Sequence, residues 1–178
     1  MKVAVVGSGA RESAILWKAL QSPYVDSAVA APGTIGTKRM AAEFGKEARN
    51  LDARIDTLDG IAGLKRSLRA MGFTDQDLIV CGPELPLALN IKDVFEPHIA
   101  VFGPDAYAAR LETSKADAKR SMRRWGVPTA DFEVFGLGEP DGRLTADDAC
   151  AFIDRTWPKY SIVKVDGLAE GKGVFVHD

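Results

Sequence analysis

The stretch KVAVVGSGARE, residues 2–12, decides the fold of this chain of 178 residues. Residues 2–6 form an apolar run that leads directly into a turn with two glycines. Strands of a parallel sheet are buried on both faces and show such continuous apolar runs. After the turn, Ile15, Leu16 and Leu20 recur at helical spacing. The stretch therefore predicts a buried parallel strand, a tight turn and a helix.

The alternation of strand and helix patterns continues as far as the dipeptide Gly103-Pro104. Strands that alternate with helices indicate a doubly wound parallel α/β sheet of the Rossmann type, with ligands beyond the carboxyl ends of its strands. We assign residues 1–103 to an N-terminal α/β domain and residues 104–178 to a second, smaller part. The further elements predicted in the first part are strands at 26–31, 77–82 and 99–103 and helices at 57–71 and 85–95.

The second part begins with a helix that has clear end signals. In TSKADAKRSMRRWGVP, residues 113–128, Ser114 and Asp117 fit a capping box, and Gly126 with Pro128 fits a C-terminal stop. A further helix is predicted from about Ala146 to Trp157 and a strand over residues 160–166.

Composition excludes several classes of protein. Hydrophobic residues at 46% and charged residues at 27% are ordinary for a soluble globular protein. A net charge of −2 gives no reason to expect nucleic acid or an anionic membrane as partner. Cys81 and Cys150 are too few and too far apart for a disulfide framework or a zinc site. Without a signal peptide or a membrane span in the sequence, we expect a cytoplasmic protein.

The first candidate site is the turn GSGARE, residues 7–12. It opens a helix, where backbone amides and the helix dipole favour an anion, and Arg11 adds a charged donor. Glu12 stands where a dinucleotide fingerprint has its third glycine, and residues 30–32 lack the acidic residue that closes the second strand. Both departures argue against a nicotinamide cofactor. A phosphate site and a turn that needs glycine only for tightness both remain open.

Two more loops fall at carboxyl ends of predicted strands. APGTIGT, residues 31–37, offers glycine amides and two hydroxyls, and GPELPL, residues 82–87, offers a carboxylate suited to a pair of sugar hydroxyls. Each loop alone is typical of a plain connection, but three on one rim predict a phosphorylated sugar as ligand. The predicted substrate-binding residues are Gly7, Gly9, Arg11, Glu12, Gly33, Thr34, Gly36, Thr37, Pro83 and Glu84.

The second candidate site is VKVDGLAEGKGV, residues 163–174. It predicts a strand, a glycine-rich turn that carries Lys172, and the start of another strand, which together suit a phosphate. Lys164 lies in mid-strand, where a lysine needs an anionic partner. Lys115 is a weaker candidate, because the four other basic residues of its helix indicate a solvated face. Those four residues are Lys119, Arg120, Arg123 and Arg124.

These motifs, together with VFGPDAYAARLETSKADAK, resemble in order and spacing the glycinamide ribonucleotide synthetases, the phosphoribosylamine–glycine ligases of the ATP-grasp superfamily. The resemblance covers essentially the whole chain. It implies ATP-dependent ligation of glycine to 5-phosphoribosylamine in purine biosynthesis, through a glycyl phosphate. It also implies that the first hundred residues contribute to the phosphoribosylamine site and that residues 104–178 are linker helices and the incomplete beginning of an ATP-grasp domain. Loop 167–173 would then be a lid over the triphosphate of ATP. The ATP-binding residues implied are Lys115, Lys164, Gly167, Gly171, Lys172 and Gly173.

Complete members of the family are more than twice as long as this chain. The resemblance therefore implies an amino-terminal portion that is inactive alone, whose partner is the missing C-terminal half of the enzyme. The magnesium ligands and most of the adenine pocket are expected outside this chain, so we assign no catalytic residue and no metal ligand.

The chain departs from the family pattern at four positions. The family usually has glycine at Ala10, histidine at Ser13, asparagine at Thr34, and a small or apolar residue at Glu170. The change at Ser13 affects the expected substrate contacts, and Glu170 adds a negative charge to the expected lid. One alternative function is a non-catalytic phosphosugar- or nucleotide-binding module. Another is a related ATP-grasp carboxylase or formyltransferase, against which the quoted motifs favour the glycine ligase.

Overall fold

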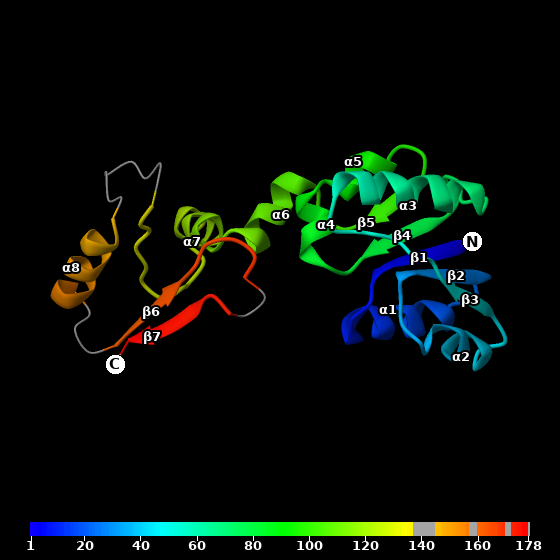
Figure 1. Cartoon of the computed structure of the whole chain (residues 1–178), viewed down its shortest axis with the longest axis horizontal. Helices are drawn as coiled ribbons and strands as arrows, with labels where there is room; N and C mark the ends of the chain where they lie inside the picture. Colours follow the sequence, from blue (N-terminus) through cyan, green and yellow to red (C-terminus); the bar gives the residue numbers. More distant parts are fainter. Residues whose placement is uncertain (137–144, 157–159, 170–171, 178) are drawn as a thin grey trace. The chain divides into compact units, whose positions relative to one another are not determined.

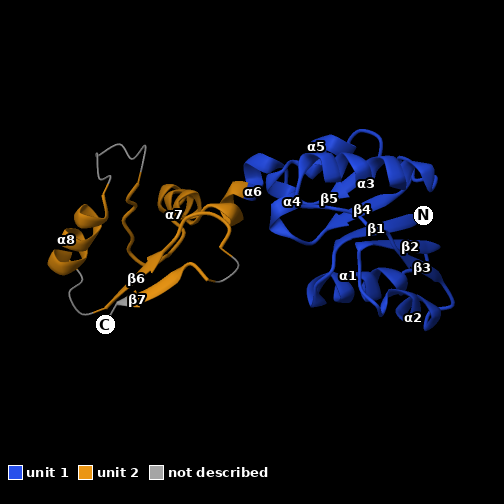
Figure 2. Cartoon of the chain, in the orientation of Figure 1, with its two compact units in different colours: residues 1–109 blue, residues 110–178 orange. Residues whose placement is uncertain are grey.

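The computed structural model describes residues 1–136, 145–156, 160–169 and 172–177. The chain divides into two compact units, Met1–Ala109 and Arg110–Asp178 (Figure 2). The division falls within a helix, and each unit is described by itself below.

Unit 1 contains a five-stranded parallel sheet, which confirms the predicted α/β class (Figure 1). The strand order is β3-β2-β1-β4-β5, and each neighbouring pair is parallel. The chain builds outward from β1 to β3 and then returns to the other side of β1, so its direction changes between β1 and β4. Ligand sites are expected at such a change, beyond the carboxyl ends of the strands. The strands are β1 (Lys2–Gly7), β2 (Ser27–Pro32), β3 (Glu47–Asn50), β4 (Leu78–Cys81) and β5 (Ala100–Phe102).

Helices cover both faces of this sheet (Figure 1). Because side chains alternate along a strand, Ala4 and Val6 of β1 pack in one buried cluster with α3 and α5, whereas Val3 and Val5 pack in another with α1 and α2. Thr57 caps α3 by accepting the Gly60 N–H at 3.1 Å. The helices are α1 (Ala10–Leu20), α2 (Thr37–Ala42), α3 (Leu58–Ala70), α4 (Glu84–Ala88), α5 (Ile91–Phe95) and α6 (Ala106–Thr113).

Parts of unit 1 differ from the sequence-based expectations. The elements β3, α2 and α6 had not been predicted, and β3 consists mostly of polar residues at an edge of the sheet. The prediction of one helix over residues 85–95 is wrong, because the chain forms the two short helices α4 and α5. The break lies at Asn90, whose φ of 60° is left-handed. Asparagine tolerates this conformation, and its Nδ2 donates to Asp93 at 2.6 Å.

The described residues of unit 2 form, after the end of α6, the helices α7 and α8 and an antiparallel pair of strands. One half of the predicted capping box of α7 is confirmed, because Ser114 Oγ accepts the Asp117 N–H at 3.0 Å. The Ser114 N–H donates to the Arg110 carbonyl, and the Asp117 carboxylate accepts from Arg110 at 2.8 Å. The predicted stop is confirmed at Gly126, where φ is 68°. The predicted end of α8 at Trp157 lies outside the described residues. The elements are α7 (Lys115–Arg124), α8 (Ala146–Thr156), β6 (Ser161–Lys164) and β7 (Val174–His177).

Three of the four basic side chains that follow Lys115 on α7, those of Arg120, Arg123 and Arg124, are exposed, as the solvated-face interpretation predicted, but two of the four also make specific contacts with the segment after the helix. Lys119 Nζ donates to Thr129 Oγ1 at 2.6 Å and to the Ala130 carbonyl at 3.0 Å. Arg123 donates to the Phe132 carbonyl at 3.1 Å, and its guanidinium lies 4.1 Å from the centre of that ring. Two basic residues therefore hold the segment after α7 against the helix.

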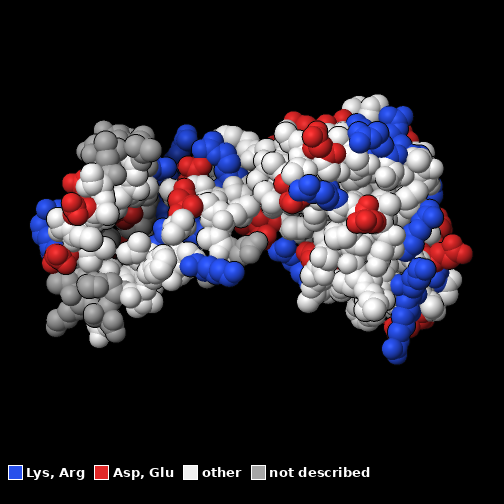
Figure 3. Space-filling model, in the orientation of Figure 1, with Lys and Arg blue, Asp and Glu red and all other residues white. Residues whose placement is uncertain are grey.

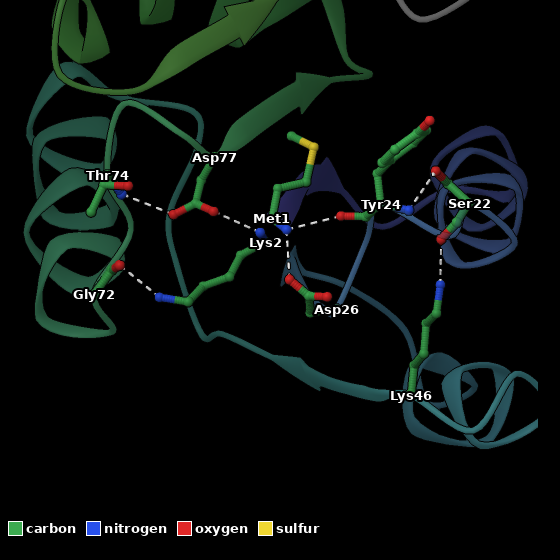
Figure 4. A network of polar contacts seen from close by, with 9 residues as sticks. All are labelled: Met1, Lys2, Ser22, Tyr24, Asp26, Lys46, Gly72, Thr74 and Asp77. Atoms are coloured by element: carbon green, nitrogen blue, oxygen red, sulfur yellow. Dashed lines mark hydrogen bonds and ion pairs between the residues drawn. The ribbon is translucent and has the colours of Figure 1, made fainter.

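A polar network fastens the amino ends of the strands (Figure 4). Asp77 accepts the Lys2 N–H at 2.6 Å, and Lys2 Nζ donates to the Gly72 carbonyl at 2.6 Å. The amino group of Met1 pairs with Asp26 at 2.6 Å. These contacts lie at the edge of the sheet opposite the predicted site, so we interpret them as structural.

Basic and acidic side chains are interspersed on the face of unit 1 seen in Figure 3, in keeping with the small net charge. Among the described residues, no helix combines the length and the apolar character needed to cross a membrane.

Candidate functional site

The three predicted loops meet at the carboxyl end of β1. The Gly33 N–H donates to the Gly7 carbonyl at 3.1 Å, which fastens the end of β2 to β1. On the other side, the Gly82 N–H donates to the Val6 carbonyl at 3.1 Å, which fastens the end of β4. We call the loops 7–12, 31–37 and 82–87 together the rim.

The first loop of the rim is filled by one of its own side chains. Glu12 is only 7% exposed, and its Oε2 accepts the Gly9 N–H at 2.7 Å. Gly9 is the N-cap of α1, so this carboxylate lies where the amides and dipole of the helix favour a negative charge. Glu12 therefore occupies the place in which the sequence had suggested a phosphate.

Arg11 connects the first and third loops. Its Nε donates to Glu12 Oε1 at 2.9 Å, and Nη1 lies 3.4 Å from Glu84 Oε1. The hydrogen bond to Glu12 is the main cause of a raised pKa of Arg11; burial opposes it, and the bond to Glu84 adds to it. The Arg11 side chain is still 52% exposed, so a ligand can reach it. The structure thus brings together Arg11, predicted to donate hydrogen bonds to a phosphate, and Glu84, predicted to accept them from sugar hydroxyls.

The second loop is tied by its own side chains. Thr37 begins α2 and is 1% exposed, and its Oγ1 accepts the Thr34 N–H at 3.3 Å. Asn50, at the end of β3, donates from Nδ2 to the Thr34 carbonyl at 2.7 Å. Thr37 therefore shapes the loop, whereas Thr34 and Gly36 are half-buried. No local pattern points to Asn50, because β3 has no apolar alternation that would predict a strand.

The third loop follows β4 and opens α4, with Pro83 as N-cap and Glu84 as first helical residue. Cys81 precedes it and is buried. Burial raises the pKa of the Cys81 thiol to about 12, and the negative charges of Glu12 and Glu84 add to this while Arg11 opposes it. The thiol is therefore no nucleophile at neutral pH.

The rim of the isolated chain holds little enclosed space. The crevice there has a volume of about 10 Å³, and a larger cavity of about 200 Å³ lies at the amino ends of the strands. In parallel α/β sheets ligands bind at the carboxyl ends, so we favour the rim despite its smaller volume. The crevice is lined by Val5, Gly7, Glu12, Ser13, Leu16, Ala30, Gly33, Thr34 and Thr37.

In unit 2, the two predicted lysines have different surroundings. Lys115 Nζ donates to the Gly167 carbonyl at 2.7 Å. Lys164 is exposed on β6, opposite Val174 of β7, on the face that also carries Ile162 and Val176. This face combines one cation with exposed aliphatic side chains.

The loop between β6 and β7 is anchored at its root by Asp166, which had not been predicted as a site residue. Asp166 accepts from the Ser114 hydroxyl at 2.9 Å and from the Ala116 N–H at 3.1 Å, so it caps α7. Lys172 is exposed. A Cβ on the buried Gly173 would lie 2.8 Å from Ala169 Cβ, so this glycine is needed for packing. Gly171 and Glu170 lie outside the described residues.

No group of three His, Cys, Asp or Glu side chains within the described ranges could hold a metal ion. We therefore assign no magnesium ligand there.

Comparison with known proteins identifies the family. The family described as phosphoribosylglycinamide synthetase, N domain, matches residues 1–112. The chain is 41% identical to the phosphoribosylamine–glycine ligase of Xanthomonas campestris pv. campestris, over 99% of this chain and 36% of that protein. It is 42% identical to the enzyme of that name from Allochromatium vinosum, over 100% of this chain and 37% of the relative. The chain thus spans little more than a third of the length of these relatives.

Similarity to a solved structure supports the α/β fold described above. The biotin carboxylase domain of the 2-oxoglutarate carboxylase of Hydrogenobacter thermophilus, solved with MgADP, ADP and bicarbonate, matches with a TM-score of 0.68 at 22% identity. The match covers 98% of this chain and 37% of that one. At this identity the likeness concerns the fold alone. The match over residues 1–112 covers well over half of the chain, which therefore belongs to the phosphoribosylglycinamide synthetase N-domain family.

Proposed function

We propose that this chain serves the ATP-dependent ligation of glycine to 5-phosphoribosylamine, which gives glycinamide ribonucleotide in purine biosynthesis. The family and the names of the relatives support this reaction. The observation that carries the proposal is the meeting of three loops at the end of β1, where Arg11 bridges to Glu84.

The rim would hold the phosphosugar. Arg11 and Glu84 offer a cation and a carboxylate side by side, which suits a ligand with both an anionic group and hydroxyls. Thr34 adds a half-buried side chain from the second loop. Gly7, Gly9, Gly33, Gly36 and Pro83 shape the turns that carry these side chains.

Unit 2 would hold the nucleotide. Lys115, Lys164 and Lys172 supply positive charge for a triphosphate, and the exposed aliphatic face beside Lys164 suits a base. The carboxylase of the same fold was solved with MgADP, which supports ATP as cofactor by analogy of fold. When bound, ATP supplies the phosphoryl group that activates the carboxylate of glycine. The side chains of this chain bind and orient, and we assign none of them to proton transfer.

Calorimetric titration of the 178-residue chain with ribose 5-phosphate tests the phosphosugar site. We expect weak, measurable binding that Arg11→Ala and Glu84→Ala each reduce roughly tenfold or more, since hydrogen bonds to charged groups contribute about 1.5–3 kcal/mol. Arg69→Ala is the matched control, because Arg69 is an exposed arginine in the last turn of α3. Equal binding by all three variants would refute the assignment.

A second titration ranks the two sites. We expect ATP to bind more weakly than ribose 5-phosphate, because the exposed face beside Lys164 would enclose little of an adenine base. Tight ATP binding without a response to the phosphosugar would reverse this order. We also expect no product from the 178-residue chain with ATP, glycine and phosphoribosylamine, and turnover above background would contradict this.

A further inference from the structure

Three glycines of the rim, in loops 7–12 and 82–87, are arranged around the side chain of Glu12. A Cβ on Gly82 would lie 2.1 Å from Glu12 Oε1 and 2.6 Å from its Cγ. A Cβ on Gly7 would lie 2.5 Å from the same Cγ, and one on Gly9 would lie 2.7 Å from Oε2. Glycines of two loops are therefore needed to admit a carboxylate of the protein itself.

The charges around this carboxylate are unfavourable for an external anion. Arg11 is shared between Glu12 and Glu84, so the three side chains together carry a net negative charge. The negative charges of Glu12 and Glu84 also contribute to the raised pKa of the neighbouring Cys81 thiol. A phosphate at the start of α1 would have to displace Glu12 or lie against it.

We propose that Glu12 is a specificity-determining residue, whose resident carboxylate closes the N-terminus of α1 to phosphates and dinucleotides. The turn 7–12 differs from the dinucleotide fingerprint mainly by Glu12 in place of the third glycine. Through this one residue it rejects the pyrophosphate that the fingerprint binds. Combined with the proposed function, this means that phosphoribosylamine presents its hydroxyls to Glu12 and that its phosphate is held by the exposed Arg11 side chain rather than at the Gly9 amide.

The test is a titration of the ¹⁵N-labelled chain with inorganic phosphate at constant ionic strength, followed at the amides of Gly7, Gly9 and Gly82. In the wild-type chain we expect no saturable shift of the Gly9 amide at millimolar phosphate. In Glu12→Ala we expect a saturable shift with at least about tenfold tighter binding, because the helix N-terminus is vacated and a like charge is removed. Glu12→Gln, which removes the negative charge but keeps an oxygen acceptor in the same place, should bind phosphate more tightly than the wild-type chain and less tightly than Glu12→Ala.

Glu43→Ala removes an exposed carboxylate at the end of α2 and serves as matched control, with the wild-type response expected. A saturable shift of Gly9 in the wild-type chain overturns the proposal, and so does a folded Glu12→Ala chain that does not respond. If Glu12→Ala does not fold, the wild-type titration and Glu12→Gln still decide. Failure of ribose 5-phosphate to bind would refute the proposed function but would leave the phosphate result at Gly9 unaffected.

Discussion

Replacing Gly82 by alanine tests how tightly the rim is built around Glu12. Gly82 does not have a positive φ, so its backbone accepts alanine without strain. The added Cβ would nevertheless lie 2.1 Å from Glu12 Oε1 and 2.7 Å from Cδ, far inside contact distance. Glu12 must therefore leave its place and give up the hydrogen bond from the Gly9 N–H.

The expected cost follows from these contacts. Losing a hydrogen bond to a charged acceptor costs about 1.5–3 kcal/mol, and restricting the unfolded chain by Gly→Ala returns about 0.4–1 kcal/mol. The half-exposed pair of Arg11 with Glu12 contributes little, about 0–1 kcal/mol. We expect Gly82→Ala to lower the free energy of unfolding of unit 1 by about 1–2 kcal/mol, since the first two terms oppose each other.

A double-mutant cycle separates this mechanism from a general loss of stability. In Glu12→Ala the obstacle is absent, so adding Gly82→Ala should cost nothing or stabilise slightly. The coupling energy between the two positions should be about 1.5–3 kcal/mol. Gly36→Ala is the matched control on the same rim, because its Cβ would have only an ordinary contact, 3.8 Å from Thr34 Oγ1.

The assay is urea unfolding followed by the fluorescence of Trp17, which lies on α1 in unit 1. Trp125 and Trp157 are replaced by phenylalanine in all variants, so that only unit 1 is observed. If the effects of Glu12→Ala and Gly82→Ala simply add to within about 0.5 kcal/mol, the two residues do not compete for one place and the reasoning is wrong.

Three further predictions concern other parts of the chain. With a thiol reagent at pH 8, the exposed Cys150 should react rapidly and Cys81 only on unfolding, because burial and Glu12 raise the pKa of Cys81 to about 12. Rapid reaction of two thiols in the native chain, or of one thiol in Cys150→Ser, would contradict this. Burial alone would raise the pKa of Asp166, but hydrogen bonds from the Ala116 amide and the Ser114 hydroxyl outweigh it and hold the pKa below its usual value. The stability that Asp166 provides is therefore present above its pKa in the unfolded chain and is lost as pH falls through its pKa in the folded chain. Thermal unfolding of unit 2, followed at Trp125, should therefore show a loss of stability below about pH 4 that Asp166→Asn diminishes and Asp154→Asn does not. If the unfolding temperature depends on pH equally in the two variants, the Asp166 cap is not the cause of this loss. Amides of β6 and β7 should exchange with solvent much faster than those of β1, because a two-stranded sheet with Ile162 and Phe175 about 60% exposed buries little apolar surface. Uniform strong protection of both sheets would contradict this.

The sequence by itself determined the elements whose signals are local. Continuous apolar runs predicted β1, β2, β4 and β5. For β1 and β2 the reason is burial on both faces, which needs apolar residues at nearly every position. Spacing predicted α1 and α3, and Ser114 and Gly126 marked the ends of α7, because caps depend on residues within one helical turn. The convergence of three loops also followed from order alone, since the carboxyl ends of parallel strands lie at one edge.

Only the tertiary structure decided which groups meet on the rim and how far each is engaged. Glu12 was recognised as a departure from a fingerprint, but its burial among glycines depends on Gly82, seventy residues away in the chain. Arg11 pairs with Glu84, Asn50 holds Thr34, and Asp166 caps the helix that begins at Lys115. Such pairings depend on distances between segments remote in sequence, and no local pattern encodes them. The polar strand β3 formed for the same physical reason, because hydrogen bonds to β2, rather than the character of its own residues, hold it in the sheet.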